Sequence, residues 1–313
     1  MELKNKNLRD IYVDLLLEEA EKNPNVVIVE ADLSAALASK RFFQKYPNRA
    51  INVGVAEANM IGVAAGLANM GKLPFTHTFT PFASRRVMDQ VTLSVAYSQL
   101  NVKMVGSDPG VMAQLNGGTH MSLEDIAVMR AIPTMTVVEP VDGVQLASLF
   151  PQIVKHNGPV YIRLMRKGND NVYDEGETFE LGKAKVIKEG KDVTIFCSGI
   201  EVKESVEAEK LLAEKGISAG VVNIHTIKPL DVETIVKEAQ RTGAVVTAEN
   251  HNIINGLGSA VAEALVENCP VVMERVGTRD HFGEVGKQDF LMEKYGLKAH
   301  HIVDAVEKVL KRK

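Results

Sequence analysis

Short, mostly apolar runs recur along this chain and alternate with segments of helical periodicity. The runs at 26–32 (VVIVEAD), 73–79 (LPFTHTF) and 102–108 (VKMVGSD) are typical of strands that are buried on both faces. Segments with helical spacing separate them, as at 56–70 (AEANMIGVAAGLANM). Strands and helices in this order predict an α/β fold, with parallel sheets covered by helices on both faces.

The alternation stops at one place, the polar stretch KGNDNVYDEGETFELGK (167–183), and resumes with DVTIFCSG (192–199). A polar, glycine-containing stretch without periodicity is typical of a linker between domains. The chain has 313 residues, and at about 150 residues per domain this length fits two domains. We therefore predict one domain at 1–170 and a second at 185–313.

Finer expectations concern single elements. We expect one helix from about Pro81 to Ser98 and one strand within 219–229 (AGVVNIHTIKP). Ser122, followed three residues later by Asp125, resembles a capping box. The turn Gly256–Leu257–Gly258 lacks the third glycine of a dinucleotide fingerprint, so we expect it to serve helix–strand packing.

Composition excludes several classes of function. The formal charge is −4, aromatic residues make up 5% and tryptophan is absent, so a nucleic-acid partner is not expected. Acidic residues interrupt the N-terminal apolar runs, which is unlike a signal peptide. The uncharged stretch 58–71 is too short to cross a bilayer. We predict a soluble, cytoplasmic protein without a membrane partner.

Cysteine and histidine usage predicts neither a disulfide framework nor a metal site. Cys197 and Cys269 lie in apolar stretches and are expected to be buried thiols. His251, His300 and His301 have no further ligand at metal-site spacing, so we expect them at the surface.

Ligands of α/β sheets bind at the carboxyl ends of the strands, so the loops that follow strands hold the candidate residues. Glu57 begins a helix after a small-residue turn; it could merely complement the helix dipole, or it could be a desolvated acid with a raised pKa. Phe79 and Phe82 stand three apart at a strand-to-helix junction, and could be core residues or a platform for a ring. His120 follows the glycines of an exposed loop and could transfer a proton.

Several of these segments together resemble one family. INVGVAEANMIGVAAGLA (51–68), THTFTPF (76–82) and GGTHMSLEDIAVMRAIPTMTVVEPVD (117–142) resemble the pyrimidine-binding domain of transketolase-type thiamine diphosphate enzymes. VVNIHTIKPLD (221–231), VVTAENH (245–251) and GLGSAVAEAL (256–265) resemble the C-terminal domain of that family. The resemblance spans nearly the whole chain and implies a pyrimidine-binding domain followed by a transketolase C-terminal-like α/β domain.

The resemblance also implies roles for single residues. The family glutamate that matches Glu57 hydrogen-bonds the pyrimidine ring nitrogen, which requires a carboxyl that holds or shares a proton near neutral pH. Phe82, with Phe79 beside it, would stack on the pyrimidine ring. His120 matches a histidine near the reacting carbonyl. Asp32 matches an aspartate at the strand end that faces the cofactor.

Arg166 and Arg9 match arginines that bind the phosphate of the substrate in this family, a task suited to a bidentate guanidinium. Both assignments have alternatives: Arg9 could be a solvated helix residue, and Arg163 could take the inward position instead of Arg166. The resemblance implies a small-molecule sugar substrate, transfer of a two-carbon ketol unit from a ketose phosphate to an aldose, and a place in pentose phosphate metabolism.

The sequence departs from the sugar transketolases at three substrate-facing positions. Asn116 stands where they carry an aspartate that binds a sugar hydroxyl. Asp108 replaces a histidine that contacts phosphate, and an acid at that position would repel phosphate. Ala36 replaces a serine that binds phosphate. These departures leave open a variant ketose phosphate or a substrate with a different anionic end.

Full-length transketolases begin with a diphosphate-binding domain that carries a GDG…N magnesium motif, and no GDG occurs here. We therefore expect a C-terminal subunit of a split transketolase. An N-terminal partner would hold the diphosphate and Mg²⁺ of the thiamine diphosphate, in an α2β2-type assembly. The alternatives are the β subunit of a 2-oxo acid dehydrogenase and a catalytically silent binding subunit. Deoxyxylulose phosphate synthase has a similar loop but carries its own diphosphate domain.

Overall fold

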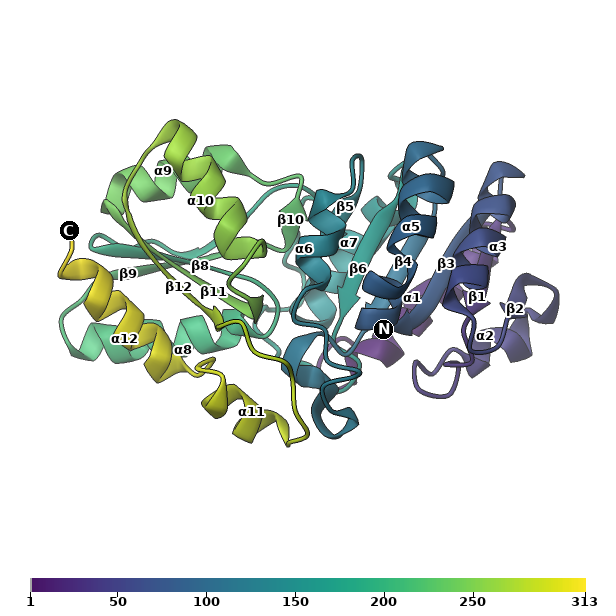
Figure 1. Ribbon diagram of the computed structural model, residues 1–313, viewed down its shortest axis with the longest axis horizontal. Helices are drawn as coiled ribbons and strands as arrows, with labels where there is room; N and C mark the ends of the chain where they lie inside the picture. Colours follow the sequence, from purple (N-terminus) through teal and green to yellow (C-terminus); the bar gives the residue numbers. More distant parts are fainter. Residues whose placement is uncertain (1) are drawn as a thin grey trace.

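The computed structural model describes residues 2–313, which form two α/β units side by side (Figure 1). The first unit contains a seven-stranded sheet and the second a five-stranded sheet, and most neighbouring strands are parallel. Helices cover both faces of each sheet (Figure 1). The α/β class and the parallel sheets predicted from the alternating pattern are confirmed.

The first sheet has the strand order β10-β5-β6-β4-β3-β1-β2. Six of its strands come from the part of the chain before the segment 167–183: β1 (Val26–Glu30), β2 (Ala50–Asn52), β3 (Leu73–Phe79), β4 (Lys103–Ser107), β5 (Thr136–Val138) and β6 (Val160–Leu164). The longer helices around it are α1 (Leu8–Lys22), α2 (Lys40–Lys45), α3 (Glu57–Asn69), α6 (Asp125–Ala131) and α7 (Gly143–Lys155).

The two faces of the first sheet have separate apolar cores. Helices α1 and α7 pack on one face through fully buried side chains that include Leu8, Ile11 and Leu149. Helices α3 and α6 pack on the other face through residues that include Ile61 and Ile126. Each fully buried side chain of this size contributes roughly 1.5–3 kcal/mol to stability, so both faces anchor the strand ends firmly.

The second sheet has the strand order β12-β11-β8-β9-β7, with β7 antiparallel to β9. Its strands are β7 (Lys185–Lys188), β8 (Val193–Cys197), β9 (Ala219–Asn223), β11 (Ala244–Asn252) and β12 (Val272–Thr278). The helices of this unit are α8 (Glu201–Glu214), α9 (Val232–Thr242), α10 (Leu257–Asn268), α11 (Gln288–Lys294) and α12 (Ala299–Leu310).

One strand of the second half of the chain belongs to the first sheet. The expected single strand within 219–229 is in fact two: β9 stays in the second sheet, and β10 (Thr226–Lys228) pairs antiparallel with β5. The expectation of one strand was wrong because the chain leaves the second sheet after Asn223 and crosses to the first. A strand from the second part of the chain therefore forms one edge of the first sheet, where β10 lies beside β5 (Figure 1).

The single helix expected from Pro81 to Ser98 is broken into four short pieces. These are α4 (Thr80–Ala83), the 3-10 turn η2 (Arg85–Val87), α5 (Met88–Gln90) and the π-helical η3 (Val91–Tyr97). The break lies at Ser84, whose φ and ψ of −118° and −91° are not helical and whose hydroxyl donates to the Thr80 carbonyl oxygen at 2.7 Å. After the break, Arg85 pairs with Glu124 and Arg86 with Glu57.

Three smaller expectations were also wrong. Helix α6 begins at Asp125, the Asp125 carboxylate is engaged by Arg163 and Tyr161, and Ser122 makes no capping bond. His251 is buried rather than exposed. Cys197 is buried as expected, but Cys269 is only half-buried. The polar segment 167–183 has no helix or strand, yet Tyr173 and Phe179 within it are buried.

None of the helices in the described part of the chain is both long and apolar enough to cross a membrane.

Candidate active site

The predicted site residues lie at the carboxyl ends of neighbouring strands in the first sheet. Phe79, the last residue of β3, is in register with Ser107 of β4, which is in register with Leu164 of β6. Asp108 follows the end of β4 directly, and Arg166 lies two residues beyond the end of β6. The parallel register therefore brings together residues that are far apart in the sequence.

Glu57 is the first residue of α3 and only 4% of its side chain is exposed. This burial is what the desolvated-acid alternative requires, and the groups around the carboxyl are both solvent-exposed and charged. Val55 beside it is 74% exposed, and the Arg86 guanidinium donates to Oε1 of Glu57 at 2.8 Å. The carboxyl is thus buried next to a cation.

Phe79, Phe82 and His120 form an aromatic cluster near Glu57. The His120 ring lies edge-on to both phenylalanines, with centroid distances of 5.6 Å to Phe79 and 5.1 Å to Phe82. Both phenylalanine side chains are half-buried. A core residue would be fully buried and a platform for a ring would be exposed, so this burial does not decide between the two alternatives. The His120 Nδ1 lies 2.9 Å from the Thr119 hydroxyl, so the other ring nitrogen remains for a ligand.

Arg86 is a site residue to which the sequence patterns assigned no role. Its guanidinium carbon lies 3.7 Å from the centroid of Phe82, in a cation–π contact, while the same group contacts Glu57. A flat, nitrogen-containing group can therefore meet the Phe82 ring and the Glu57 carboxylate at once. An aminopyrimidine has the same shape and the same kind of donors, so these residues fit the ring of thiamine diphosphate.

Arg9 and Arg166 lie next to each other, as their proposed common task requires. The backbone N–H of Arg9 donates to the backbone carbonyl of Arg166 at 3.4 Å. The Arg9 guanidinium also donates to the carbonyl of Ala36 at 2.5 Å, which fixes its direction. Arg9 is partly buried and therefore is not a freely solvated helix residue.

Arg166 pairs with Asp108, whose carboxylate oxygen lies 2.7 Å from Nη2. Burial raises the pKa of Asp108 above its usual range, and the guanidinium of Arg166 acts in the opposite direction. The Arg166 guanidinium carbon lies 5.4 Å from the Phe79 ring, which connects this ion pair to the aromatic cluster. Arg166 is thus the arginine that faces the site.

Arg163 does not compete for that position. Its side chain is fully buried between the two units and donates to Asp125 and Glu139, and to the Asn250 carbonyl at 2.7 Å. The sequence left open whether Arg163 or Arg166 faces inward toward the site. Arg163 pairs with Asp125 and Glu139 between the two units, whereas Arg166 pairs with Asp108.

Asp32 and Asn116 lie at the rim. Asp32 is exposed, has a φ of 60°, and accepts a hydrogen bond from the Asn52 amide at 3.2 Å. Asn116 is exposed in the loop before His120. Asp32 lies two residues beyond the end of β1, the strand next to β3, and Asn116 lies four residues before His120.

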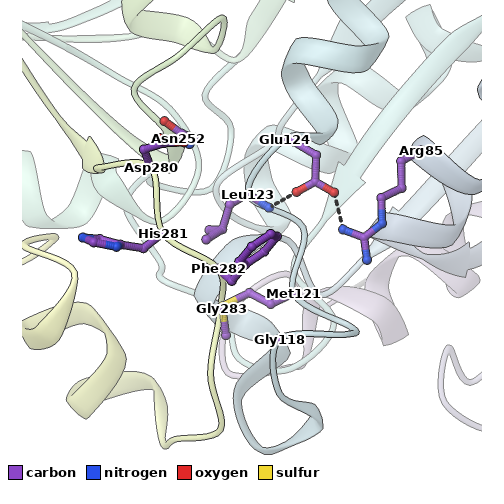
Figure 2. Close-up of a pocket in the computed structure, with 10 residues that line it drawn as sticks. All are labelled: Arg85, Gly118, Met121, Leu123, Glu124, Asn252, Asp280, His281, Phe282 and Gly283. Atoms are coloured by element: carbon purple, nitrogen blue, oxygen red, sulfur yellow. Dashed lines mark hydrogen bonds and ion pairs between the residues drawn. The ribbon is translucent and has the colours of Figure 1, made fainter.

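A cavity of about 350 Å³ adjoins the His120 loop (Figure 2). Figure 2 shows Gly118 and Met121 close to the segment 280–283, with Arg85 paired to Glu124 above. A side chain at Gly118 would collide with the Gly283 carbonyl, which lies 2.2 Å from where its Cβ would be. Segment 280–283 was not predicted from the sequence as part of the site, although its DHFG closely follows strand β12.

Two other expectations concern ligand sites elsewhere. The carboxylate of Glu249 accepts from the backbone N–H groups of Leu257 and Gly258 at 2.6 and 2.8 Å, so the chain itself occupies this helix start. Spacing along the sequence did not reveal Glu293 as a neighbour of the histidine pair; its carboxylate lies 3.3 Å from His300 and 4.0 Å from His301. In residues 2–313 these three form the one cluster that could hold a metal ion.

Comparisons with known proteins identify the two domains of the chain. Residues 4–169 match the family model for the transketolase pyrimidine-binding domain, and residues 182–302 match the model for the transketolase C-terminal domain. A solved structure described as a split gene transketolase, inactive beta4 tetramer, superposes with a TM-score of 0.89 at 43% identity, covering 97% of this chain and 98% of that one.

Two curated relatives are subunits of transketolases with different substrates. The 6-deoxy-6-sulfo-D-fructose transketolase subunit SqwH of Clostridium sp. (strain MSTE9) is 62% identical, covering 98% of this chain and 95% of the relative. A subunit of the apulose-4-phosphate transketolase of Phocaeicola vulgatus is 38% identical, covering 92% and 93%. One name specifies a sulfonated sugar and the other a phosphorylated sugar.

Proposed function

The chain belongs to the transketolase family, and we propose that it is the C-terminal subunit of a two-chain, thiamine diphosphate-dependent transketolase. The enzyme would transfer a two-carbon ketol unit from a ketose with an anionic end to an aldose. Transketolase relatives at this level of identity favour this function over that of a 2-oxo acid dehydrogenase subunit.

The observation that carries the proposal is the arrangement of Glu57 and Phe82, which a single flat guanidinium contacts at once. When bound, thiamine diphosphate supplies the carbanion-stabilising chemistry that ketol transfer needs. In the proposed site Glu57 would hold a hydrogen bond to the pyrimidine nitrogen, and Phe82 and Phe79 would orient the ring. Asp32 would contact the cofactor from the rim.

The remaining residues would bind the sugar. His120 would donate a proton to, or accept one from, a substrate oxygen, because one ring nitrogen is fixed by Thr119 and the other is left for the ligand. Arg9 and Arg166 would hold the anionic end, and Asn116 would contact a hydroxyl. A place in pentose phosphate metabolism remains a prediction, since the substrates named for the relatives differ.

The proposal includes a partner. An N-terminal subunit would bind the diphosphate and Mg²⁺, and the two chains would form an α2β2-type assembly in the cytoplasm. The related split-gene chain that assembles as a beta4 tetramer is described as inactive, which supports a requirement for the other subunit.

The test is reconstitution. The chain is purified alone and together with the N-terminal subunit, and ketol transfer and thiamine diphosphate binding are measured for both. We expect activity and tight cofactor binding only in the complex. Tight binding and ketol transfer by the isolated chain would show that the split-subunit proposal is wrong, and an inactive complex would favour the catalytically silent alternative.

A Glu57→Gln variant of the complex tests the assigned proton-transfer role. Loss of a positioned acid or base typically lowers a rate by about 10²–10⁴-fold. We expect exchange of the cofactor's thiazolium C2 proton with D₂O to slow by that factor while the complex still assembles. Near-normal exchange would remove Glu57 from this role.

A further inference from the structure

The two arginines assigned to the anionic end of the substrate each have an acidic neighbour. Arg166 is paired with Asp108 at 2.7 Å, and Nε of Arg9 lies 3.9 Å from the Asp10 carboxylate. The two positive charges are thus accompanied by two carboxylates. This group of two arginines and two aspartates differs from a purely basic phosphate site. It offers guanidinium N–H donors to a ligand but carries little net positive charge.

Asp108 is the more influential of the two acids. It is 3% exposed and is held in place directly after β4, in a left-handed conformation with φ of 58°. Its backbone N–H donates to the Leu164 carbonyl at 3.1 Å, so the residue cannot swing away into solvent. Its carboxylate lies 2.7 Å from Nη2 of Arg166 as an ion pair, and Nε of Arg166 is buried and has no hydrogen-bond partner within residues 2–313.

We propose that the Asp108–Arg166 pair makes this site selective for a ketose whose terminus carries a single negative charge, a sulfonate, over one that carries a phosphate. The inference rests on the proposed transketolase function. It assigns to Asp108 the role of a specificity-determining residue, and to Nε of Arg166 the role of a free donor for an oxygen of the terminus.

Charge is the property that can separate these two substrates. Sulfonate and phosphate termini are both tetrahedral with three outer oxygens, so donor geometry alone discriminates poorly between them. A phosphate carries about −1.5 to −2 charges at pH 7, while a sulfonate carries one. The additional charge of a phosphate would be placed against the fixed carboxylate of Asp108 in a largely buried setting, where charge repulsion is weakly screened.

The test compares 6-deoxy-6-sulfo-D-fructose with D-fructose 6-phosphate as donors for the assembled two-subunit enzyme. Glycolaldehyde serves as acceptor, because an uncharged acceptor keeps a second anion out of the same site. We measure kcat/KM for both donors with the wild type, with Asp108→Asn, and with Asp174→Asn as the matched control. Asp174 is 92% exposed in the segment between the two units.

For the wild type we expect kcat/KM for the sulfonate to exceed that for the phosphate by at least about tenfold. Asp108→Asn should reduce this ratio at least about tenfold, mainly by improving the phosphate donor, and Asp174→Asn should leave it unchanged. A merely structural role of Asp108 would lower both values together and leave the ratio constant, which would overturn the inference.

The wild-type measurement keeps the inference testable if Asp108→Asn does not fold. A wild-type enzyme that prefers the phosphate at about pH 7, where phosphate carries its additional charge, would contradict it directly. A complex that uses neither donor, nor any other ketose, would instead contradict the proposed function, so the two failures are distinguishable.

Discussion

Arg163 and Arg166 stand three residues apart at the end of strand β6, and both pair with carboxylates, but they belong to different parts of the molecule. Arg163 lies wholly within the contact between the two units, where Nε, Nη1 and Nη2 all have acceptors. Arg166 lies at the edge of the site with its side chain 14% exposed. One nitrogen of Arg166 is buried and unmatched in the described chain.

The difference shows how one residue type serves two purposes. A buried arginine whose donors are all matched by the protein has nothing left for a ligand, and it fixes the relative position of the elements around it. An arginine with a donor that the protein leaves unmatched is suited to bind an anion from outside. Both arginines are largely buried. What distinguishes them is whether every N–H group has an acceptor within the protein, as in Arg163, or whether one lacks an acceptor, as in Arg166.

The largest expected effect comes from Arg163→Met. Removing this cation leaves Asp125 and Glu139 buried without their partner, and breaking such a pair typically costs about 3–5 kcal/mol. We expect the free energy of unfolding, measured with denaturant, to fall by that amount. Arg312→Met, which breaks a pair in which the arginine is half exposed and Glu274 keeps Lys308 as a second cation, should cost less than about 1 kcal/mol. Equal costs for the two variants would contradict the comparison.

The next effect in size comes from Arg166→Lys in the assembled enzyme. Lysine keeps the charge but lacks the planar fork and the Nε donor. We expect KM for an anionic ketose to rise about tenfold, with the free energy of unfolding changed by less than about 1 kcal/mol. An uncharged ketose such as erythrulose is the control, and its KM should not change. A parallel rise for both donors would mean that Arg166 does not hold the anionic end.

The smallest effect concerns His225, whose backbone carbonyl accepts from the Glu139 backbone N–H at 2.8 Å beside the Arg163 network. Burial lowers the pKa of His225 to about 4, whereas an unfolded histidine has a pKa of about 6.5. The unfolded state therefore binds more protons between these values, so stability is present at higher pH and is lost as pH falls through this window.

A His225→Asn variant should remove this dependence. Between about pH 6.5 and about pH 5.5 the wild type should lose roughly 1 kcal/mol more unfolding free energy than the variant. Denaturant titrations at several pH values measure the difference. If the free energy of unfolding depended on pH in the same way for the wild type and the variant, protonation of His225 would not be the cause of the loss in stability.

The alternating apolar runs were sufficient to predict the α/β class and both sheets, because burial on two faces imposes that pattern on any such strand. They were insufficient to separate Arg163 from Arg166. Their difference depends on partners 24 and 38 residues away in the first case, Glu139 and Asp125, and on the register of β4 with β6 in the second. Neither is a local property.

Local patterns also failed where a single residue interrupts them. The helical periodicity of 81–98 gave no sign of the break at Ser84, which brings Arg86 onto Phe82. Glu57 was identified as a possible buried acid, but the cation beside it comes from a segment 29 residues later. The sequence and the family resemblance thus indicated the candidate residues, which stay a prediction, while their charged neighbours required the tertiary fold.

The shared strand β10 ties the folding of the two units together. Without residues 226–228, β5 would become the edge of the first sheet and would expose unpaired backbone groups around Val137 and Val138. A fragment that stops in the segment 167–183 would therefore carry an aggregation-prone edge. Engineering that exchanges the C-terminal unit between relatives has to transfer β10 together with its matching β5, since these two strands pair across the two halves of the chain.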